Sequence, residues 1–203
     1  VASSSSVYGG SDGRPCAEDR PLRPRGGYAR SKVLAEALCR HRAETGGRVV
    51  VARPFTVAGE GQRPDMVISR WLRAAAAGRP LCVLGSPERT RDITDVADVV
   101  RALRASVTSG ASGTVNIGTG TGHTLRAVAD AVAAALDVDV HLDLVPASRV
   151  EPPATLADTR RLHGLAGFVP HTDLPALVAR QARHAAATGA TGQAARAPTP
   201  VAP

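Results

Sequence analysis

The chain has 203 residues, which is room for one sizeable domain or for a domain with a small additional lobe. Hydrophobic residues make up 43% of the sequence, as is typical of a globular protein, and the formal net charge is +7. The arginines are scattered and aromatic residues amount to only 2%, which disfavours a nucleic-acid surface and favours an anionic small substrate. No apolar run approaches the length of a membrane-spanning helix.

The cysteine pattern indicates a reducing environment. Cys16, Cys39 and Cys82 are odd in number and share no spacing typical of metal ligands, so we predict free thiols and no metal site. Because no charged leader precedes a hydrophobic stretch, we expect a cytoplasmic protein without a membrane partner.

The first residues combine a short apolar start with a serine run. Val1-Ala2 precedes four serines and Gly9-Gly10 closes the stretch, which predicts the end of a buried strand that runs into a loop. Serine runs are usually flexible linkers, and the Val-Tyr-Gly at residues 7–9 is the feature that favours a functional loop. Residues 10–27 are rich in glycine, proline and charge and predict a second loop.

A helix is predicted over residues 28–45, and it carries two groups with chemical potential. Residues four apart share a helix face, so the Tyr28 hydroxyl and the Lys32 ammonium should point into the same space. The ammonium favours the phenolate and lowers a phenol pKa that starts near about 10, which gives a base usable near neutral pH. Lys32 is the only lysine in the sequence, and arginine could not replace it in this role. A surface tyrosine beside a solvated lysine is the alternative.

The remaining pattern predicts an α/β fold. The apolar stripe of the helix consists of Val33, Leu34, Ala37 and Leu38. Residues 48–53 contain a continuous apolar run, typical of a strand covered on both faces. Further elements are predicted as a helix over 65–77 with Trp71 in the core, a strand over 80–85, a helix from a Thr94 cap to about 106, a helix over 124–136, a strand over 139–145 and a helix over 173–187. The composition of residues 188–203 predicts a disordered tail.

The serine-rich Val-Tyr-Gly segment and the Tyr-x-x-x-Lys that follows it resemble the extended short-chain dehydrogenase/reductase family, the nucleotide-sugar epimerases and dehydratases. The resemblance implies that Ser4, Tyr28 and Lys32 are catalytic and that Tyr28 and Lys32 also contact NAD. Dehydratases of this family carry an Asp-Glu pair where this chain has Ser5 and Ser6. Because hydroxyls cannot replace that acid pair, the sequence favours epimerisation over 4,6-dehydration.

Residues 53–66 resemble the R-F-F-T-V-Y-G-P…R-P-D-M segment of UDP-glucuronate 4-epimerases. By this resemblance, the backbone near Pro54 and Phe55 meets the nicotinamide amide of NAD. Thr56, together with the serines at positions 5 and 6, would hydrogen-bond the sugar carboxylate, and Arg63 would supply a cation near the substrate. A structural turn before a helix is the alternative for this segment.

Two later segments also have family character. Residues 90–100 are close to the family's R-D-F-T-Y-V-D-D-V-V, which implies that Arg91 clamps the substrate diphosphate; a simple ion pair with the adjacent Asp92 is the alternative. Residues 113–122 are glycine-rich, but they lack the third dinucleotide glycine at its proper spacing. We therefore interpret them as a structural strand and turn.

The resemblance covers residues 1–187 and only about the second half of the family's pattern. It implies the C-terminal part of a Rossmann-type parallel sheet with a small α/β substrate-binding lobe. The strand, Gly-x-x-Gly-x-x-Gly turn and helix that hold the NAD pyrophosphate in this family are not among the 203 residues. We therefore expect a partial domain, either a fragment or a relic with little activity.

Taken together, the resemblance implies an NAD-dependent UDP-sugar 4-epimerase that oxidises its substrate to a 4-keto sugar and reduces it again, with a glucuronate-type sugar preferred. One alternative is an inert remnant that binds a sugar nucleotide or a partner chain. Others are a nucleotide-sugar decarboxylase or dehydratase and, with little weight, a basic nucleic-acid binder. A homodimer is compatible with the leading interpretation.

Overall fold

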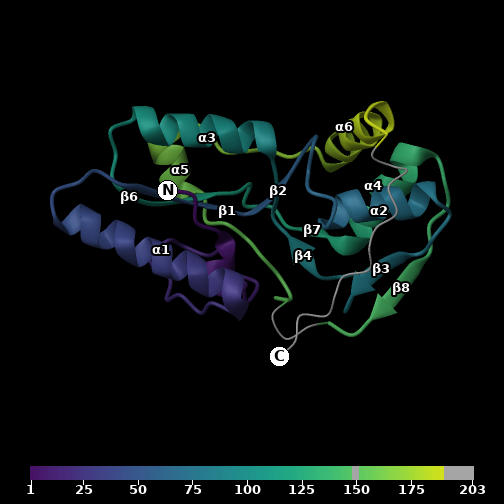
Figure 1. Ribbon diagram of the computed structural model, residues 1–203, viewed down its shortest axis with the longest axis horizontal. Coiled ribbons are helices and arrows are strands. Elements are labelled where there is room, and N and C mark those ends of the chain that lie inside the picture. The colour runs from purple at the N-terminus through teal and green to yellow at the C-terminus, as the bar shows by residue number, and fades with distance from the viewer. Residues whose placement is uncertain (148–150, 190–203) are drawn as a thin grey trace.

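The computed structural model describes residues 1–147 and 151–189, and its elements gather at two ends of an elongated molecule (Figure 1). The helices at the first end are α1 (Gly26–Glu44), α3 (Val96–Thr108) and α5 (Arg160–Ala166). The helices of the second, smaller end are α2 (Val67–Ala76), α4 (Leu125–Leu136) and α6 (Leu174–Ala187). Residues 190–203, most of the predicted disordered tail, lie outside the described residues.

Four pairs of strands connect these helices. Three pairs are parallel: β1 (Val50–Pro54) with β6 (Gly113–Ile117), β2 (Thr56–Ala58) with β5 (Ile93–Asp95), and β3 (Leu81–Leu84) with β8 (Leu142–Val145). The fourth pair is antiparallel and joins β4 (Thr90–Arg91) to β7 (His123–Thr124). The chain start lies beside β1 as well, because Ala2 forms a parallel bridge with Ala52. A 3-10 helix, η1 (Ser5–Tyr8), follows at once.

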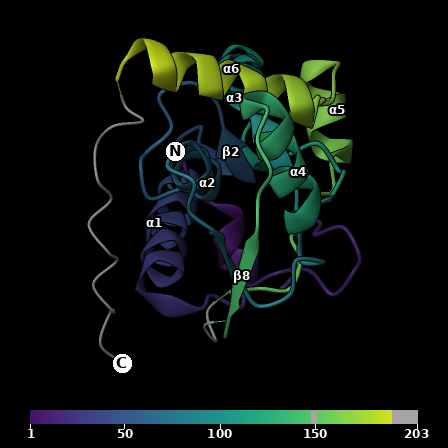
Figure 2. The ribbon, with the colours of Figure 1, turned by 90° about the vertical axis from the view of Figure 1, so that its right-hand side faces the viewer.

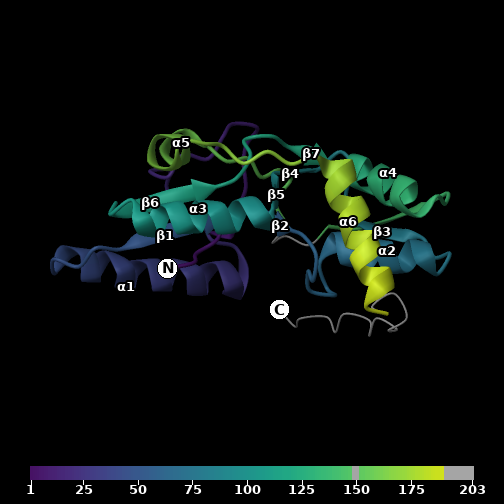
Figure 3. The same ribbon diagram turned by 90° about the horizontal axis from the view of Figure 1, so that it is seen from above.

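Helices cover both faces of the β1–β6 pair. α1 lies on one face and α3 with α5 on the other (Figure 3). β1 is buried through its middle, from Val51 to Arg53, as predicted for a strand covered on both sides. A parallel sheet sandwiched between helices is the Rossmann-type arrangement, so the predicted fold class is confirmed.

The smaller end of the molecule, which contains α2, α4 and α6 and which we call the smaller lobe, has its own apolar core. α6 crosses the top of α4 and α2, and β8 stands at this end of the molecule (Figure 2). Trp71 is 2% exposed, and its indole Nε1 donates a hydrogen bond to the Cys82 carbonyl at 3.0 Å. Trp71 is therefore a core residue, as predicted. Among the described residues, no helix combines the length and apolar character needed to span a membrane.

The predicted apolar stripe of α1 is correct for Val33, which packs against the buried cluster around Tyr8, but wrong for its two leucines. Leu34 and Leu38 are 68% and 74% exposed, whereas the buried residues of this helix are Ala29, Glu36 and Cys39. The helix is turned because the carboxylate of Glu36 pairs with a buried cation on β1. A long-range ion pair therefore decided which face of α1 is inside.

The predicted cap of α3 is also wrong, by one residue. Asp95 caps the helix, and its carboxylate accepts a hydrogen bond from the Ala97 amide at 2.9 Å. Thr94 is fully buried because it belongs to β5 and pairs with Val57 across the sheet. Thr124 does cap α4, as predicted.

Arg53, near the carboxyl end of β1, is the cation that pairs with Glu36 and so sets which face of α1 is buried. Its Nε and Nη2 donate to the two carboxylate oxygens of Glu36 at 2.8 and 2.6 Å, and both side chains are at most 4% exposed. Its Nη1 donates to the Tyr8 hydroxyl at 2.8 Å and to the Glu18 carbonyl at 3.0 Å. One guanidinium thus links β1 to α1, to η1 and to the loop after it.

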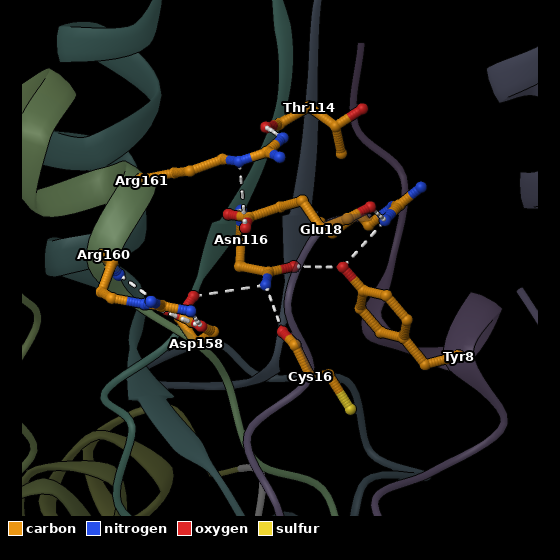
Figure 4. A network of polar contacts seen from close by, with 9 residues as sticks. Tyr8, Cys16, Glu18, Thr114, Asn116, Asp158, Arg160 and Arg161 are labelled. Carbon is orange, nitrogen blue, oxygen red and sulfur yellow. Dashed lines mark hydrogen bonds and ion pairs between the residues drawn. The ribbon is translucent and has the colours of Figure 1, made fainter. Parts of the chain in front are cut away.

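The network continues to β6 through Tyr8 (Figure 4). The Tyr8 hydroxyl donates to Oδ1 of Asn116 at 2.7 Å, and Nδ2 of Asn116 donates to the Cys16 carbonyl at 2.7 Å. Burial raises the pKa of Tyr8 to about 12, although the Arg53 guanidinium beside it acts in the opposite direction. Tyr8 therefore keeps its proton at neutral pH and serves as a structural donor.

We expect Leu177→Ala to lower the free energy of unfolding by about 2–5 kcal/mol, because it leaves a cavity in the core of the lobe. The Leu177 side chain is 0% exposed. Leu38→Ala is the matched control and should change stability by less than about 0.5 kcal/mol, since this leucine faces solvent. Urea unfolding followed by Trp71 fluorescence measures both. Equal losses in the two variants would contradict these placements.

The Glu36 carboxyl should make stability fall on acidification. Burial alone would raise its pKa, but hydrogen bonds from Arg53 and Ser3 outweigh burial and hold the pKa below its ordinary value. A carboxyl whose pKa is lowered by folding stabilises the folded state above its unfolded-state pKa of about 4.3, and this contribution is lost as the pH falls through the folded-state pKa.

We therefore expect the wild-type protein to lose stability between about pH 5 and pH 2 more steeply than Glu36→Gln, measured by urea unfolding across this range. At pH 7 the variant should be less stable by about 3–5 kcal/mol, because Arg53 is left buried without its carboxylate. Parallel pH profiles for the two proteins would show that Glu36 is not linked to folding in this way.

Candidate active site

A cavity of about 740 Å³ lies between the larger and the smaller end of the molecule. The carboxyl end of β1, the start of α1 and residues 3–6, which we call the serine loop, meet the smaller lobe there. The cavity lining consists of residues 3–6, 54–57 and 151–152 together with Gly9, Gly10, Arg25, Tyr28, Gln62, Arg63, Met66, Arg91 and Thr155. Every predicted site residue except Lys32 is among them. A cleft at the carboxyl ends of parallel strands is the usual ligand site of such a sheet.

The serine loop is shaped by short-range contacts. The Ser4 hydroxyl caps η1 and accepts a hydrogen bond from the Ser6 amide at 3.2 Å. η1 ends at Gly9, whose φ of 72° is left-handed, and a β-carbon there would lie only 2.1 Å from the Arg23 carbonyl oxygen. The Ser6 Oγ is buried and has no hydrogen-bond partner among the described residues. Its hydrogen-bonding capacity is therefore unused, although the residue lines the cavity.

Tyr28 and Lys32 lie on consecutive turns of α1 and on the same side of it. The Lys32 Nζ is 5.7 Å from the centroid of the Tyr28 ring and donates to the Ala2 carbonyl at 3.0 Å. Tyr28 is 63% exposed and forms part of the cavity wall. Lys32 stands behind the tyrosine, outside the lining. An ammonium has three N–H donors, so two remain after the bond to Ala2.

The junction between β1 and β2 forms part of the cavity wall. Phe55 is 2% exposed and its ring packs against Tyr8, with centroids 6.3 Å apart. Pro54 and Thr56, on either side of it, are half-buried and line the cavity. The side chain of Phe55 therefore fixes the position of this segment, while its neighbours face the space where a ligand would lie.

Arginines outnumber acidic residues in the cavity wall. Among the described residues that line it, Glu151 is the only one with a carboxylate side chain. Arg63 is 75% exposed and pairs with Asp65 at 2.8 Å, a hydrogen bond that lowers the Asp65 pKa. Arg91 is 13% exposed, and its Nη2 lies 2.8 Å from the Glu151 carboxylate. With Arg25 also in the lining, the wall suits an anionic ligand.

The ion pair of Arg91 differs from the alternative considered from the sequence. Asp92 does not pair with it; this fully buried carboxylate accepts hydrogen bonds from the Thr119, Gly120 and Ala157 amides at 2.8–3.0 Å. Asp92 thus ties β4 to the loop after β6 and to the segment that carries Glu151. It is a structural residue next to Arg91 and does not line the cavity.

Sequence reasoning missed several lining residues. Arg25, Gln62, Met66 and Glu151 line the cavity but were not predicted. Gln62 is held by a hydrogen bond from its Nε2 to the Val57 carbonyl at 2.8 Å. Its place in the wall depends on this contact and could not be read from the sequence.

The predicted free thiols are confirmed, because Cys16, Cys39 and Cys82 are all unpaired. Among residues 1–147 and 151–189, no three His, Cys, Asp or Glu side chains gather as they would around a metal ion.

Comparison with known proteins gives one family. A profile described as the NAD dependent epimerase/dehydratase family matches residues 1–118. UDP-glucuronic acid decarboxylase 1 of Danio rerio is 30% identical over 178 residues, which are 84% of this chain and 43% of that protein. The structure of UDP-glucuronic acid 4-epimerase from Bacillus cereus with UDP-glucuronic acid and NAD is 26% identical, with a TM-score of 0.87 over 92% of this chain and 60% of that one.

MoeE5, solved in complex with UDP-glucuronic acid and NAD, is 37% identical, with a TM-score of 0.86 over 93% of this chain and 64% of that chain. The chain therefore spans less than two thirds of the length of these relatives. The family match over residues 1–118 nevertheless includes every residue of the cavity wall except Glu151, Pro152 and Thr155. On these grounds the chain belongs to the NAD dependent epimerase/dehydratase family.

Proposed function

We propose that this chain provides the sugar-nucleotide cavity and the catalytic base of an NAD-dependent UDP-sugar 4-epimerase, with a UDP-uronic acid such as UDP-glucuronate as the substrate. One observation carries the proposal: the serine loop, Tyr28 and three arginines line a single cavity of about 740 Å³. That volume lies in the range of roughly 300–1,000 Å³ that small-molecule ligands occupy. We further infer that residues 1–187 form the C-terminal part of the family's domain.

The proposed chemistry begins at the sugar 4-hydroxyl. Tyr28, as the general base, takes the proton of this hydroxyl, with the Ser4 hydroxyl as a hydrogen-bond partner. Lys32, whose Nζ is 5.7 Å from the centroid of the Tyr28 ring, would bind the nicotinamide ribose. After the sugar turns over, the same tyrosine returns the proton to the oxygen at carbon 4, so no proton is consumed in the cycle.

The residues that bind the negative groups of the substrate line another part of the cavity wall. Arg91 binds the diphosphate, whose oxygens displace the Glu151 carboxylate from the guanidinium. Arg63 and the hydroxyls of Thr56 and Ser5, together with the unpartnered Ser6 hydroxyl, bind the sugar carboxylate. The distribution suits a ligand with a negative group at each end.

The residues present fit the nicotinamide end of NAD. The Lys32 ammonium keeps two N–H donors after its bond to Ala2, which matches a ribose with two neighbouring hydroxyls. The backbone at Pro54 and Phe55 faces the same region and would meet the nicotinamide amide. When bound, NAD supplies the acceptor for the hydride of carbon 4 and later returns it.

Two related reactions compete with epimerisation. Dehydration is disfavoured, because Ser5 and Ser6 offer no acid to expel a hydroxyl from carbon 6. Decarboxylation of UDP-glucuronate is the stronger rival, since a decarboxylase is among the curated relatives that match most of this chain. The two reactions share the first oxidation at carbon 4 and differ in whether the carboxylate is lost.

Calorimetric titration with UDP and UDP-glucuronate tests the cavity. We expect saturable binding of both ligands and a loss of about tenfold or more in Arg91→Gln, because a charge-assisted hydrogen bond is removed. Arg104→Gln is the matched control, since it removes the same charge from the exposed face of α3. Tyr28→Phe should leave the affinity for UDP unchanged. If the two arginine variants behave alike, the diphosphate does not bind at Arg91.

Product analysis in the presence of NAD tests the reaction. The expected product is UDP-galacturonate, the C4 epimer, and Tyr28→Phe should reduce its rate of formation at least about 100-fold. Release of carbon dioxide with a UDP-pentose would establish decarboxylation in its place. If UDP-glucuronate binds but neither product forms, the chain binds a sugar nucleotide without catalysing either reaction.

A further inference from the structure

A second cavity lies behind the wall of the first, between α2, α6 and the loop of residues 59–66. Its volume is about 260 Å³, and Gln62 lines both cavities. α6 crosses over α2 here (Figure 3). The position is distinct from the proposed sugar-nucleotide site, so the following inference does not rest on that function.

Three buried polar atoms around this cavity have no hydrogen-bond partner among the described residues: Nε2 of Gln181, Oε1 of Gln62 and Nε of Arg73. Gln181 is only 4% exposed, so its amide is removed from bulk water. Buried polar groups without partners are unfavourable and rare in folded proteins. Three of them on one cavity indicate that the space normally holds something polar.

Two of these side chains are held by other contacts. Gln62 donates its own amide to the Val57 carbonyl, which leaves its Oε1 as an unpaired acceptor on a side chain that lines both cavities. The Arg73 guanidinium is anchored by a hydrogen bond from Nη2 to the Pro64 carbonyl, which leaves Nε free. The residues that line the cavity therefore carry two unpaired donors, on Gln181 and Arg73, and one unpaired acceptor, on Gln62.

The charges of the side chains that line the cavity limit the class of ligand further. Arg73 is cationic, His184 also lines the cavity, and no carboxylate of the described residues does. Two donors beside a cation suit a carboxylate, and the remaining acceptor requires a group that donates. The volume is below the range of about 300–1,000 Å³ that drug-sized ligands occupy. We propose that this cavity binds a small hydroxycarboxylate, its carboxylate on Arg73 and Gln181 and its hydroxyl on Gln62.

Lactate and propionate form a matched pair of probes, because they differ by the hydroxyl that would donate to Gln62. We expect lactate to cause saturable shifts of the Gln62 and Gln181 side-chain amide signals in nitrogen-15 NMR spectra. Propionate should bind at least about tenfold more weakly, since it leaves the Gln62 acceptor unpaired. Saturation with UDP should not displace lactate.

Variants separate this site from the rest of the protein. Gln181→Glu is nearly isosteric and places a carboxylate against the ligand, so lactate binding should be lost while circular dichroism stays that of a folded protein. Arg73→Gln should weaken binding, and Arg183→Gln, an exposed arginine on the same helix as Gln181, should not. The proposal would be overturned by equal affinity for the two probes, by displacement of lactate by UDP, or by the absence of any saturable shift. The last result would indicate that the cavity holds only water.

Discussion

The buried pair of Arg53 and Glu36 is the interaction on which the site depends. Removing two charges from water is unfavourable, and this pair tolerates it because the guanidinium makes two hydrogen bonds to the carboxylate and two more to Tyr8 and Glu18. The Ser3 hydroxyl donates to the same carboxylate at 2.5 Å. One ion pair thus holds a strand, a helix and the serine loop in a single arrangement.

That arrangement explains why Tyr28 and the serine loop line one cavity. With Glu36 turned inward, the face of α1 that carries Tyr28 and Lys32 is directed toward the end of β1. The serine loop is held through Ser3 and Tyr8, so that it lines the same cavity as Tyr28. Arg63, in the loop before α2, and Arg91, on β4, line another part of the wall, which is the anion-binding side in the proposed function.

The sequence predicted what local rules decide. The fold class, the pairing of Tyr28 with Lys32 on one helix face and the buried Trp71 follow from periodicity, spacing and family pattern. The face of α1 could not be predicted from an apolar stripe, because Leu34 and Leu38 were outweighed by a long-range ion pair. Arg53 at the end of an apolar strand did carry a signal: a charge in such a place needs a buried partner. The Glu151 contact and the second cavity depend on tertiary packing and left no trace in the pattern.

A crystal structure of the chain with UDP-glucuronate is the most direct test of the claim that these elements form one catalytic cavity. The account predicts the sugar 4-hydroxyl within hydrogen-bond distance of the Tyr28 hydroxyl, about 2.6–3.2 Å. It also predicts the diphosphate on Arg91, with Glu151 displaced. A sugar bound elsewhere, or a 4-hydroxyl turned away while Tyr28 remains in solvent, would contradict it.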